Sequence, residues 1–207
     1  MLRSLALSVV LCCVAWVPSQ AQEQVQVQPG SLIAGFSPLE LSERWWQWAF
    51  SFERVRSPIA DRTGQMCASR QSGDVWFLAG TYGTARVVRT CHVPQGKFLF
   101  FPLINYVTFR GENSEEPCSS LIERAAKLTD SPFALVLEVD GRQAKDLQLH
   151  RLASTTCFSL VPGEPLDAAG NGYYVALAPL AKGVHVINFG GILSTMSQAV
   201  TYRVVVE

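Results

Sequence analysis

The segment at residues 97–109 constrains the fold more than any other part of the sequence. In an extended chain its two faces are both apolar, with Phe98, Phe100 and Ile104 on one face and Leu99, Phe101, Leu103 and Val107 on the other. A strand that is apolar on both faces belongs inside a sheet that is covered on both sides. The sequence therefore predicts a central strand here, with other elements packed against each of its faces.

Short strands separated by Gly- and Pro-containing turns are expected through most of the remaining chain. The expected strands lie at 75–79, 86–93, 133–139, 147–149, 156–161, 173–180, 184–192 and 199–206. The glycine-bracketed turn at 80–83 favours a hairpin of the first two strands, and Asp140-Gly141 favours a hairpin turn after the third. A long polar loop is expected at 162–172. This spacing predicts a mainly β fold, an antiparallel β-sandwich of the immunoglobulin-like or jelly-roll-like kind.

Two helices are expected beside the strands. Ser37-Pro38-Leu39-Glu40 is a capping box with proline at the first helical position, and an apolar stripe follows at Leu41, Trp45, Trp48 and Phe52. Trp46 is rotated about 100° from Trp45 on this N-terminal amphipathic helix. We therefore expect Trp45 and Trp48 in the core and Trp46 on a ligand-binding face, where indole stacks well on a sugar ring. A second capping box predicts one short additional helix at 120–128.

The N-terminus has the pattern of a cleaved secretory signal peptide. A short basic start at Arg3 precedes an apolar run at 5–17, and Ser19-Gln20-Ala21 supplies the small residues read by signal peptidase. We expect residues 1–21 to be removed after Ala21, and the protein to be secreted or periplasmic. Residues 22–36 are expected to form a polar linker and residues 37–207 a single domain. No later apolar run is long enough for a transmembrane segment.

Export determines how the remaining cysteines are interpreted. Cys67, Cys91, Cys118 and Cys157 form an even set, and disulfides are the default in an oxidising compartment. Of the three possible pairings we favour Cys67–Cys91 with Cys118–Cys157, because the first pair brackets the expected hairpin. A zinc site is the alternative, but no C-x-x-C or H-x-x-x-H spacing supports it. No metal site is therefore expected.

Charge and motifs exclude several classes of function. The sequence has 17 basic and 17 acidic residues, so a non-specific nucleic-acid binder is not expected. It contains no G-x-S-x-G, H-E-x-x-H, P-loop or G-x-G-x-x-G motif, and no cofactor is expected. The three histidines lie far apart in the sequence, and His185 is in an apolar strand where a core position is favoured. Catalysis by a carboxylate pair needs no local motif, and Glu43, Asp61 and Asp74 are its candidates.

Asn105 interrupts the apolar face of the central strand. A buried amide must find several hydrogen-bond partners or cost a few kcal/mol. It therefore either holds a loop in place or points into a binding site.

Several strings resemble those of a group of exported bacterial proteins of unassigned function. They are WWQW at 45–48, GDVWFLAG at 73–80, TCHVPQGK at 90–97 and FPLIN at 101–105. The resemblance implies export and the use of disulfides. It also directs attention to five candidate ligand-binding residues within these strings or between them: Trp46, Gln71, Asp74, Lys97 and Asn105.

Two functions of different classes remain open. The first is an extracytoplasmic binding or interaction module for a glycan or a cell-envelope component, using tryptophan and amide groups. The second is a small secreted glycoside hydrolase with a carboxylate pair.

Overall fold

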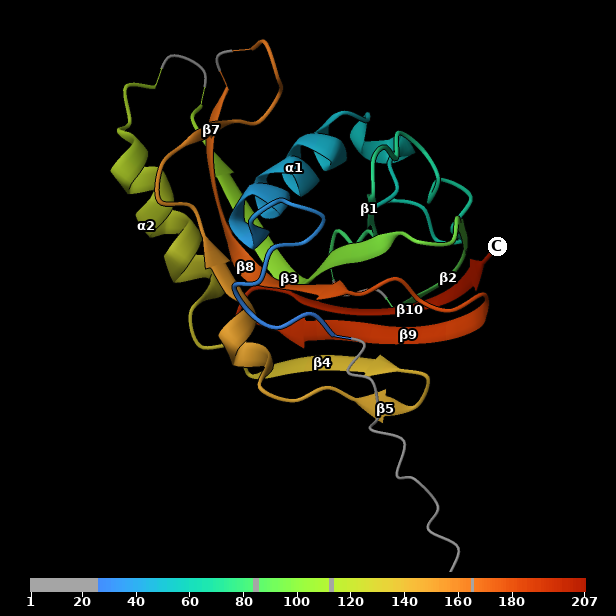
Figure 1. Ribbon diagram of the computed structural model, residues 1–207. Coiled ribbons are helices and arrows are strands. Elements are labelled where there is room, and N and C mark those ends of the chain that lie inside the picture. The colour runs from blue at the N-terminus through green and yellow to red at the C-terminus, as the bar shows by residue number, and fades with distance from the viewer. Residues whose placement is uncertain (1–25, 84–85, 112–113, 165) are drawn as a thin grey trace, which may run out of the picture.

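The computed structural model describes residues 26–83, 86–111, 114–164 and 166–207. The expected signal peptide lies outside these ranges. The described chain is mainly β and forms two five-stranded sheets accompanied by two α-helices (Figure 1). The predicted fold class, a β-sandwich with few helices, is therefore confirmed.

The first sheet has the strand order β1-β3-β8-β6, and β7 also pairs with β8. Its strands are β1 (Val75–Phe77), β3 (Phe98–Phe109), β6 (Arg151–Ala153), β7 (Phe158–Ser159) and β8 (Asp167–Leu177). The second sheet has the order β2-β10-β9-β4-β5. Its strands are β2 (Arg86–Val93), β4 (Ala134–Val139), β5 (Arg142–Gln143), β9 (Gly183–Ile192) and β10 (Ser197–Val206).

Strand β3 occupies the central position that its two apolar faces predict. One face packs between the sheets, where Phe101 and Leu103 are fully buried against residues of the second sheet such as Phe189. The opposite face packs under α1 (Pro38–Phe50), which lies across the first sheet on the side away from the second sheet (Figure 1). The molecule therefore has two apolar layers, one on each side of β3.

A bulge in β3 changes which residues share a face. The register with β8 shifts between Pro102 and Ile104, so Leu103 and Ile104 both pack toward the second sheet. The sequence pattern had placed Ile104 with Phe98 and Phe100, and this assignment is wrong. After the bulge Asn105 lies on the α1 side of the sheet, where its amide contacts Tyr174.

The expected hairpin of the first two strands is absent from the structure. Strand β1 pairs in parallel with β3 of the first sheet, whereas β2 pairs in parallel with β10 of the second. The chain between them therefore crosses from one sheet to the other. The sandwich also departs from the all-antiparallel arrangement at these two pairs, while the β4–β5 hairpin at Asp140-Gly141 is confirmed.

The two α-helices form where the sequence predicts them. The hydroxyl of Ser37 accepts a hydrogen bond of 3.1 Å from the backbone N–H of Glu40, as the capping box requires. Helix α2 (Cys118–Thr129) begins two residues before the expected start, after Pro117, and packs on β8 and β3. None of the helices in the described ranges is long and apolar enough to span a membrane.

Three other expectations are corrected by the structure. The described part of the linker packs instead of standing free: Val27 donates to the carbonyl of Ala176 and Ile33 is buried. The expected strand near Leu149 is a short 3-10 helix, η2 (Leu147–His150), in which Leu149 is exposed and His150 buried. The expected loop at 162–172 ends early, because β8 already begins at Asp167.

The favoured disulfide pairing is confirmed. Cys67 pairs with Cys91 and Cys118 with Cys157, with Cα–Cα distances of 5.8 and 5.7 Å. The first bridge is buried and joins the loop before β1 to β2. The second joins the start of α2 to the segment just before β7, so each bridge ties a loop or helix to the sandwich.

Candidate functional site

A cavity of about 430 Å³ opens between α1, β3 and three loops. This volume is within the range of roughly 300–1,000 Å³ that is typical of small-molecule sites. The loops are those around η1 (Arg54–Arg56), around Gly80–Gly83 and between β9 and β10. The lining residues come from these elements: Trp45, Trp46, Phe50, Arg54, Ile59, Gly80, Thr81, Tyr82, Gly83, Asn105, Tyr106, Val107, Thr195, Met196 and Gln198.

The inner wall is made by the tryptophans of α1. Trp46 stands edge-on to Trp45 with ring centroids 4.9 Å apart, and to Phe50 at 6.1 Å. Trp46 is only 8% exposed and belongs to the same apolar cluster as Trp45 and Trp48. The expectation that Trp46 faces away from the core is therefore wrong. It is a core residue whose remaining exposed edge lines the cavity.

A glycine makes room for the Trp46 ring. A Cβ at Gly170 of β8 would lie 3.1 Å from the indole nitrogen, which is closer than ordinary van der Waals contact. The indole N–H is buried and has no hydrogen-bond partner among the described residues. The edge of the Trp46 ring that carries the indole nitrogen therefore packs on the sheet, and only the rest of the ring is accessible to a ligand.

Asn105 lies in the cavity wall where β3 resumes after its bulge. Its Nδ2 donates a hydrogen bond of 3.0 Å to the phenol oxygen of Tyr174. Burial raises the pKa of Tyr174, although the hydrogen bond from Asn105 acts in the opposite direction, so the phenol stays protonated at physiological pH. This is the one side-chain hydrogen bond that the described residues provide to Asn105, so its amide oxygen is available to a ligand.

Gln198 of β10 forms the floor and holds the two sheets together. Its amide oxygen accepts from the backbone N–H of Thr81 at 3.0 Å. Its amide nitrogen, Nε2, donates to the carbonyls of Pro102 and Leu103 at the bulge. Since the amide oxygen and the amide nitrogen of Gln198 both already form hydrogen bonds within the protein, this residue has a structural role in the cavity wall and few groups left for a ligand.

The outer rim carries the exposed aromatic residues. The guanidinium carbon of Arg54 lies 4.8 Å from the centre of the Tyr82 ring, a cation–π geometry. The hydroxyls of two other lining residues, Tyr106 and Thr195, are 3.0 Å apart. Tyr82 is 45% exposed, so it is the aromatic lining residue with the most surface free for contact.

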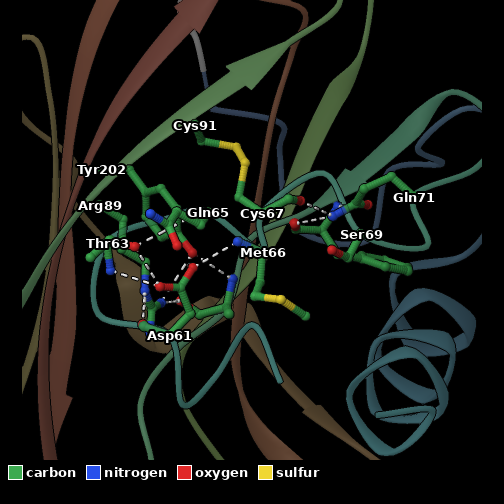
Figure 2. The surroundings of a disulfide bond; sticks show 12 residues. Asp61, Thr63, Gln65, Met66, Cys67, Ser69, Gln71, Arg89, Cys91 and Tyr202 are labelled. Atoms are coloured by element: carbon green, nitrogen blue, oxygen red, sulfur yellow. Dashed lines mark hydrogen bonds between the residues drawn. A yellow bond between two sulfur atoms is a disulfide. The ribbon is translucent and has the colours of Figure 1, made fainter. Parts of the chain in front are cut away.

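A buried arginine behind the cavity holds two of its loops. Arg89 of β2 is 1% exposed and donates to the carbonyls of Ile59 and Asp61 on one side and of Ala79 and Gly80 on the other. It also donates to the hydroxyl of Tyr202 at 3.1 Å. Figure 2 shows Arg89 with Asp61 and Tyr202 beside the Cys67–Cys91 bridge. Arg89 therefore positions the segments that carry Ile59 and Gly80 into the cavity wall.

The other three candidate ligand-binding residues lie elsewhere. Gln71 donates to the carbonyls of Cys67 and Phe77 and accepts from the N–H of Phe77, so its amide ties the loop to β1 (Figure 2). Lys97 donates to the carbonyl of Gly73 at 2.6 Å and lies 3.4 Å from the Asp74 carboxylate. Of the five candidates, the structure brings together Trp46 and Asn105 and leaves Gln71, Asp74 and Lys97 outside the cavity.

None of the candidate catalytic carboxylates lines the cavity. Burial of the Asp61 carboxylate raises its pKa. The hydrogen bonds that it accepts from the backbone N–H groups of Thr63 and Met66 outweigh this effect, so its pKa is lowered. The pKa of Glu43 is raised by burial and then by the charge of Glu40. Asp74 is exposed and paired with Lys97. Asp61 and Asp74 therefore have local structural partners, and none of the three carboxylates faces this cavity.

Comparison with known proteins identifies no family. No protein-family model matches the chain, and no curated protein matches it significantly. Among solved structures, amebosin matches with 9% identity over 58% of this chain and 97% of its own, with a TM-score of 0.20. PbICP-C, solved in complex with falcipain-2, matches with 15% identity over 65% of this chain and 100% of its own, with a TM-score of 0.27. Such low TM-scores support no argument about this protein.

Proposed function

We propose that the protein is an exported binding protein whose cavity takes a glycan or another cell-envelope component. The observation that carries this proposal is the composition of the cavity wall. Aromatic side chains from α1, β3 and the loop after β1 surround a small number of amide and hydroxyl groups. Ligand sites in general combine a mostly apolar lining with a few oriented polar groups.

A sugar ring suits this arrangement because it has one apolar face and a polar edge. Tyr82 at the rim keeps 45% of its surface exposed although Arg54 lies over its ring, and Trp46 offers a buried edge further in. Asn105 contributes an amide oxygen that can accept a hydrogen bond from a sugar hydroxyl. Stacking would supply most of the affinity, and the amide would orient the ring.

Binding is favoured over hydrolysis by the absence of acidic residues from this wall. Among the described residues, no lining side chain is an aspartate, a glutamate or a histidine. Glycoside hydrolysis by the usual route needs two carboxyl groups that flank the scissile bond. The carboxylate-pair alternative therefore finds no support in this cavity.

An extracytoplasmic location is part of the same proposal. Two disulfides in one chain are typical of proteins that fold in an oxidising compartment. Together with the expected signal peptide at residues 1–21, they support a secreted or periplasmic protein. Such a protein would meet envelope polysaccharides and peptidoglycan fragments directly.

A glycan array tests the proposal when it is followed by titration of the hits. The array should include neutral and acidic oligosaccharides and muropeptides, and bound polymers should be analysed for cleavage products. We expect at least one ligand to bind and to be recovered uncut. Tyr82→Ala should weaken that binding about tenfold or more, because stacked aromatic anchors dominate such contacts.

Phe133→Ala is the matched control. Phe133 is also an exposed aromatic residue, 76% accessible, but it lies at the start of β4 and outside the cavity. Its removal should leave affinity unchanged. If no array member bound, or if both variants weakened binding equally, the proposed function would be rejected. Recovery of cleaved products would instead favour the hydrolase.

A further inference from the structure

Among the described residues that line the cavity, one is charged, and it is a cation. Arg54 is exposed at the rim, and no aspartate or glutamate is among the described lining residues. Its guanidinium lies over the Tyr82 ring, which fixes its position without neutralising its charge. Among the described residues its guanidinium forms neither an ion pair nor a hydrogen bond.

The arginines of the described chain differ in whether they have a carboxylate partner. Arg44 pairs with Glu40 of the same helix, and Arg110, Arg124 and Arg151 pair with carboxylates of other segments. Arg54 shares the lack of a partner with other exposed arginines such as Arg56 and Arg62, but it lines the cavity, where its hydrogen-bond donors can meet a ligand. A planar guanidinium held in place at a ligand site is suited to bind a carboxylate through two parallel hydrogen bonds.

We propose that the ligand of this cavity carries a carboxylate, as uronic acids do, and that Arg54 binds that group. The inference rests on the proposed function and narrows its ligand class. The sugar ring would contact Tyr82 and the inner aromatic wall, while its acidic substituent would lie at the rim beside Arg54. Neutral glycans would fill the same space without this ion pair.

A matched pair of ligands isolates the carboxylate. Trigalacturonic acid and its methyl ester have the same rings, and they differ in the charge of the C6 group. We expect the acid to bind the wild-type protein roughly tenfold more tightly than the ester at low salt. This preference should shrink at about 0.5 M salt, because the ion pair lies at the surface and is screened.

Two arginine variants assign the effect to a residue. Arg54→Gln should remove the preference for the acid, so that the acid and the ester bind with similar affinity. Arg56→Gln is the control, since Arg56 lies in the same short helix η1, is exposed, and does not line the cavity. It should keep the full preference. Retention of the preference in Arg54→Gln, or its loss in Arg56→Gln, would overturn the assignment.

A second pair of probes separates this inference from the glycan proposal. Indole-3-acetate and indole-3-acetamide are aromatic and differ mainly in charge. If neither sugar binds but the acetate binds more tightly than the amide in an Arg54-dependent way, the carboxylate inference stands and the glycan proposal fails. If the sugars bind equally well as acid and ester, the glycan proposal stands and the carboxylate inference fails. If neither pair shows a preference for the acid, the inference is overturned.

Discussion

The side-chain amide of Asn105 donates a hydrogen bond of 3.0 Å to the phenol oxygen of Tyr174. This bond joins the central strand β3 to its neighbour β8 on the face covered by α1, where Tyr174 also contacts Trp45 edge-on. It exists because the bulge in β3 turns Asn105 to this side of the sheet. The wall of the cavity and the packing of α1 therefore depend on the same pair of residues.

Removing the phenol oxygen should destabilise the fold. Tyr174→Phe leaves the buried Asn105 amide without its partner, and an unsatisfied buried donor costs about 1–3 kcal/mol. Urea denaturation followed by tryptophan fluorescence would measure the loss. Tyr106→Phe serves as the control, because its hydroxyl bonds to Thr195 in an exposed position and should cost about 0.5 kcal/mol or less. Similar losses in both variants would contradict a special role for Tyr174.

Truncation of Trp46 should be as damaging as truncation of its neighbours. Trp46, Trp45 and Trp48 are all buried in one cluster, and replacing a buried tryptophan by alanine costs about 3–5 kcal/mol. The melting temperatures of the three alanine variants should therefore all fall markedly. An unchanged melting temperature for Trp46→Ala alone would restore the view that this ring serves a ligand and not the core.

Loss of the buried Arg89 side chain should destabilise the protein and damage the cavity. Arg89→Leu removes the guanidinium donor from four backbone carbonyls, and we expect a loss of about 3 kcal/mol or more. Chemical denaturation measures the stability, and ligand titration measures the site. Arg86→Leu is the control on the same strand, because Arg86 is exposed and should change stability little.

The two disulfides should differ in how readily they are reduced. Cys67 and Cys91 are buried, whereas Cys118 and Cys157 are partly accessible. Mild reductant with mass mapping of alkylated peptides should therefore detect opening of Cys118–Cys157 first. In a separate test, Cys91→Ala should lower the free energy of unfolding by about 2–5 kcal/mol, the usual loss for a native bridge. Initial labelling of Cys67 or Cys91 in the folded protein would show that this buried region opens easily.

Stability should fall as the pH drops below about 6.5 because of His150. Burial lowers the pKa of this imidazole, although a hydrogen bond with the backbone of Tyr174 acts in the opposite direction. The unfolded chain then binds a proton that the folded chain does not, so the contribution of His150 is present above about pH 6.5 and is lost in acid. Melting temperatures between about pH 7.5 and 5 would measure it, and His150→Gln should flatten the decline.

His185 provides an internal check with the opposite sign. Burial of its ring lowers the pKa, but hydrogen bonds with Asp140 and Ala181 outweigh this effect and raise the pKa. Its contribution is therefore present in acid and is lost as the pH rises through the folded-state pKa. His185→Gln should make the acid decline steeper. If both histidine variants shifted the pH profile in the same direction, one of the two assignments would be wrong.

Local features of the sequence determined most of the elements. The Ser37 capping box sets the start of α1 because its hydroxyl and the N–H it bonds are three residues apart. The alternation of apolar and polar residues predicts β2, and the apolar residues on both faces of β3 predict a buried central strand. The cysteine pairing also followed from the sequence, although the hairpin used to argue for it does not exist.

Contacts between distant segments decided the rest. The pairing of β1 with β3, the bulge that turns Asn105, and the fit of Trp46 against Gly170 all depend on residues far away in the chain. Arg89 falls on the buried face that alternation predicts, yet only the folded chain brings four carbonyls around it. Periodicity reports which face of a segment is apolar, whereas partner, register and cavity arise from the joint packing of elements that no local pattern encodes.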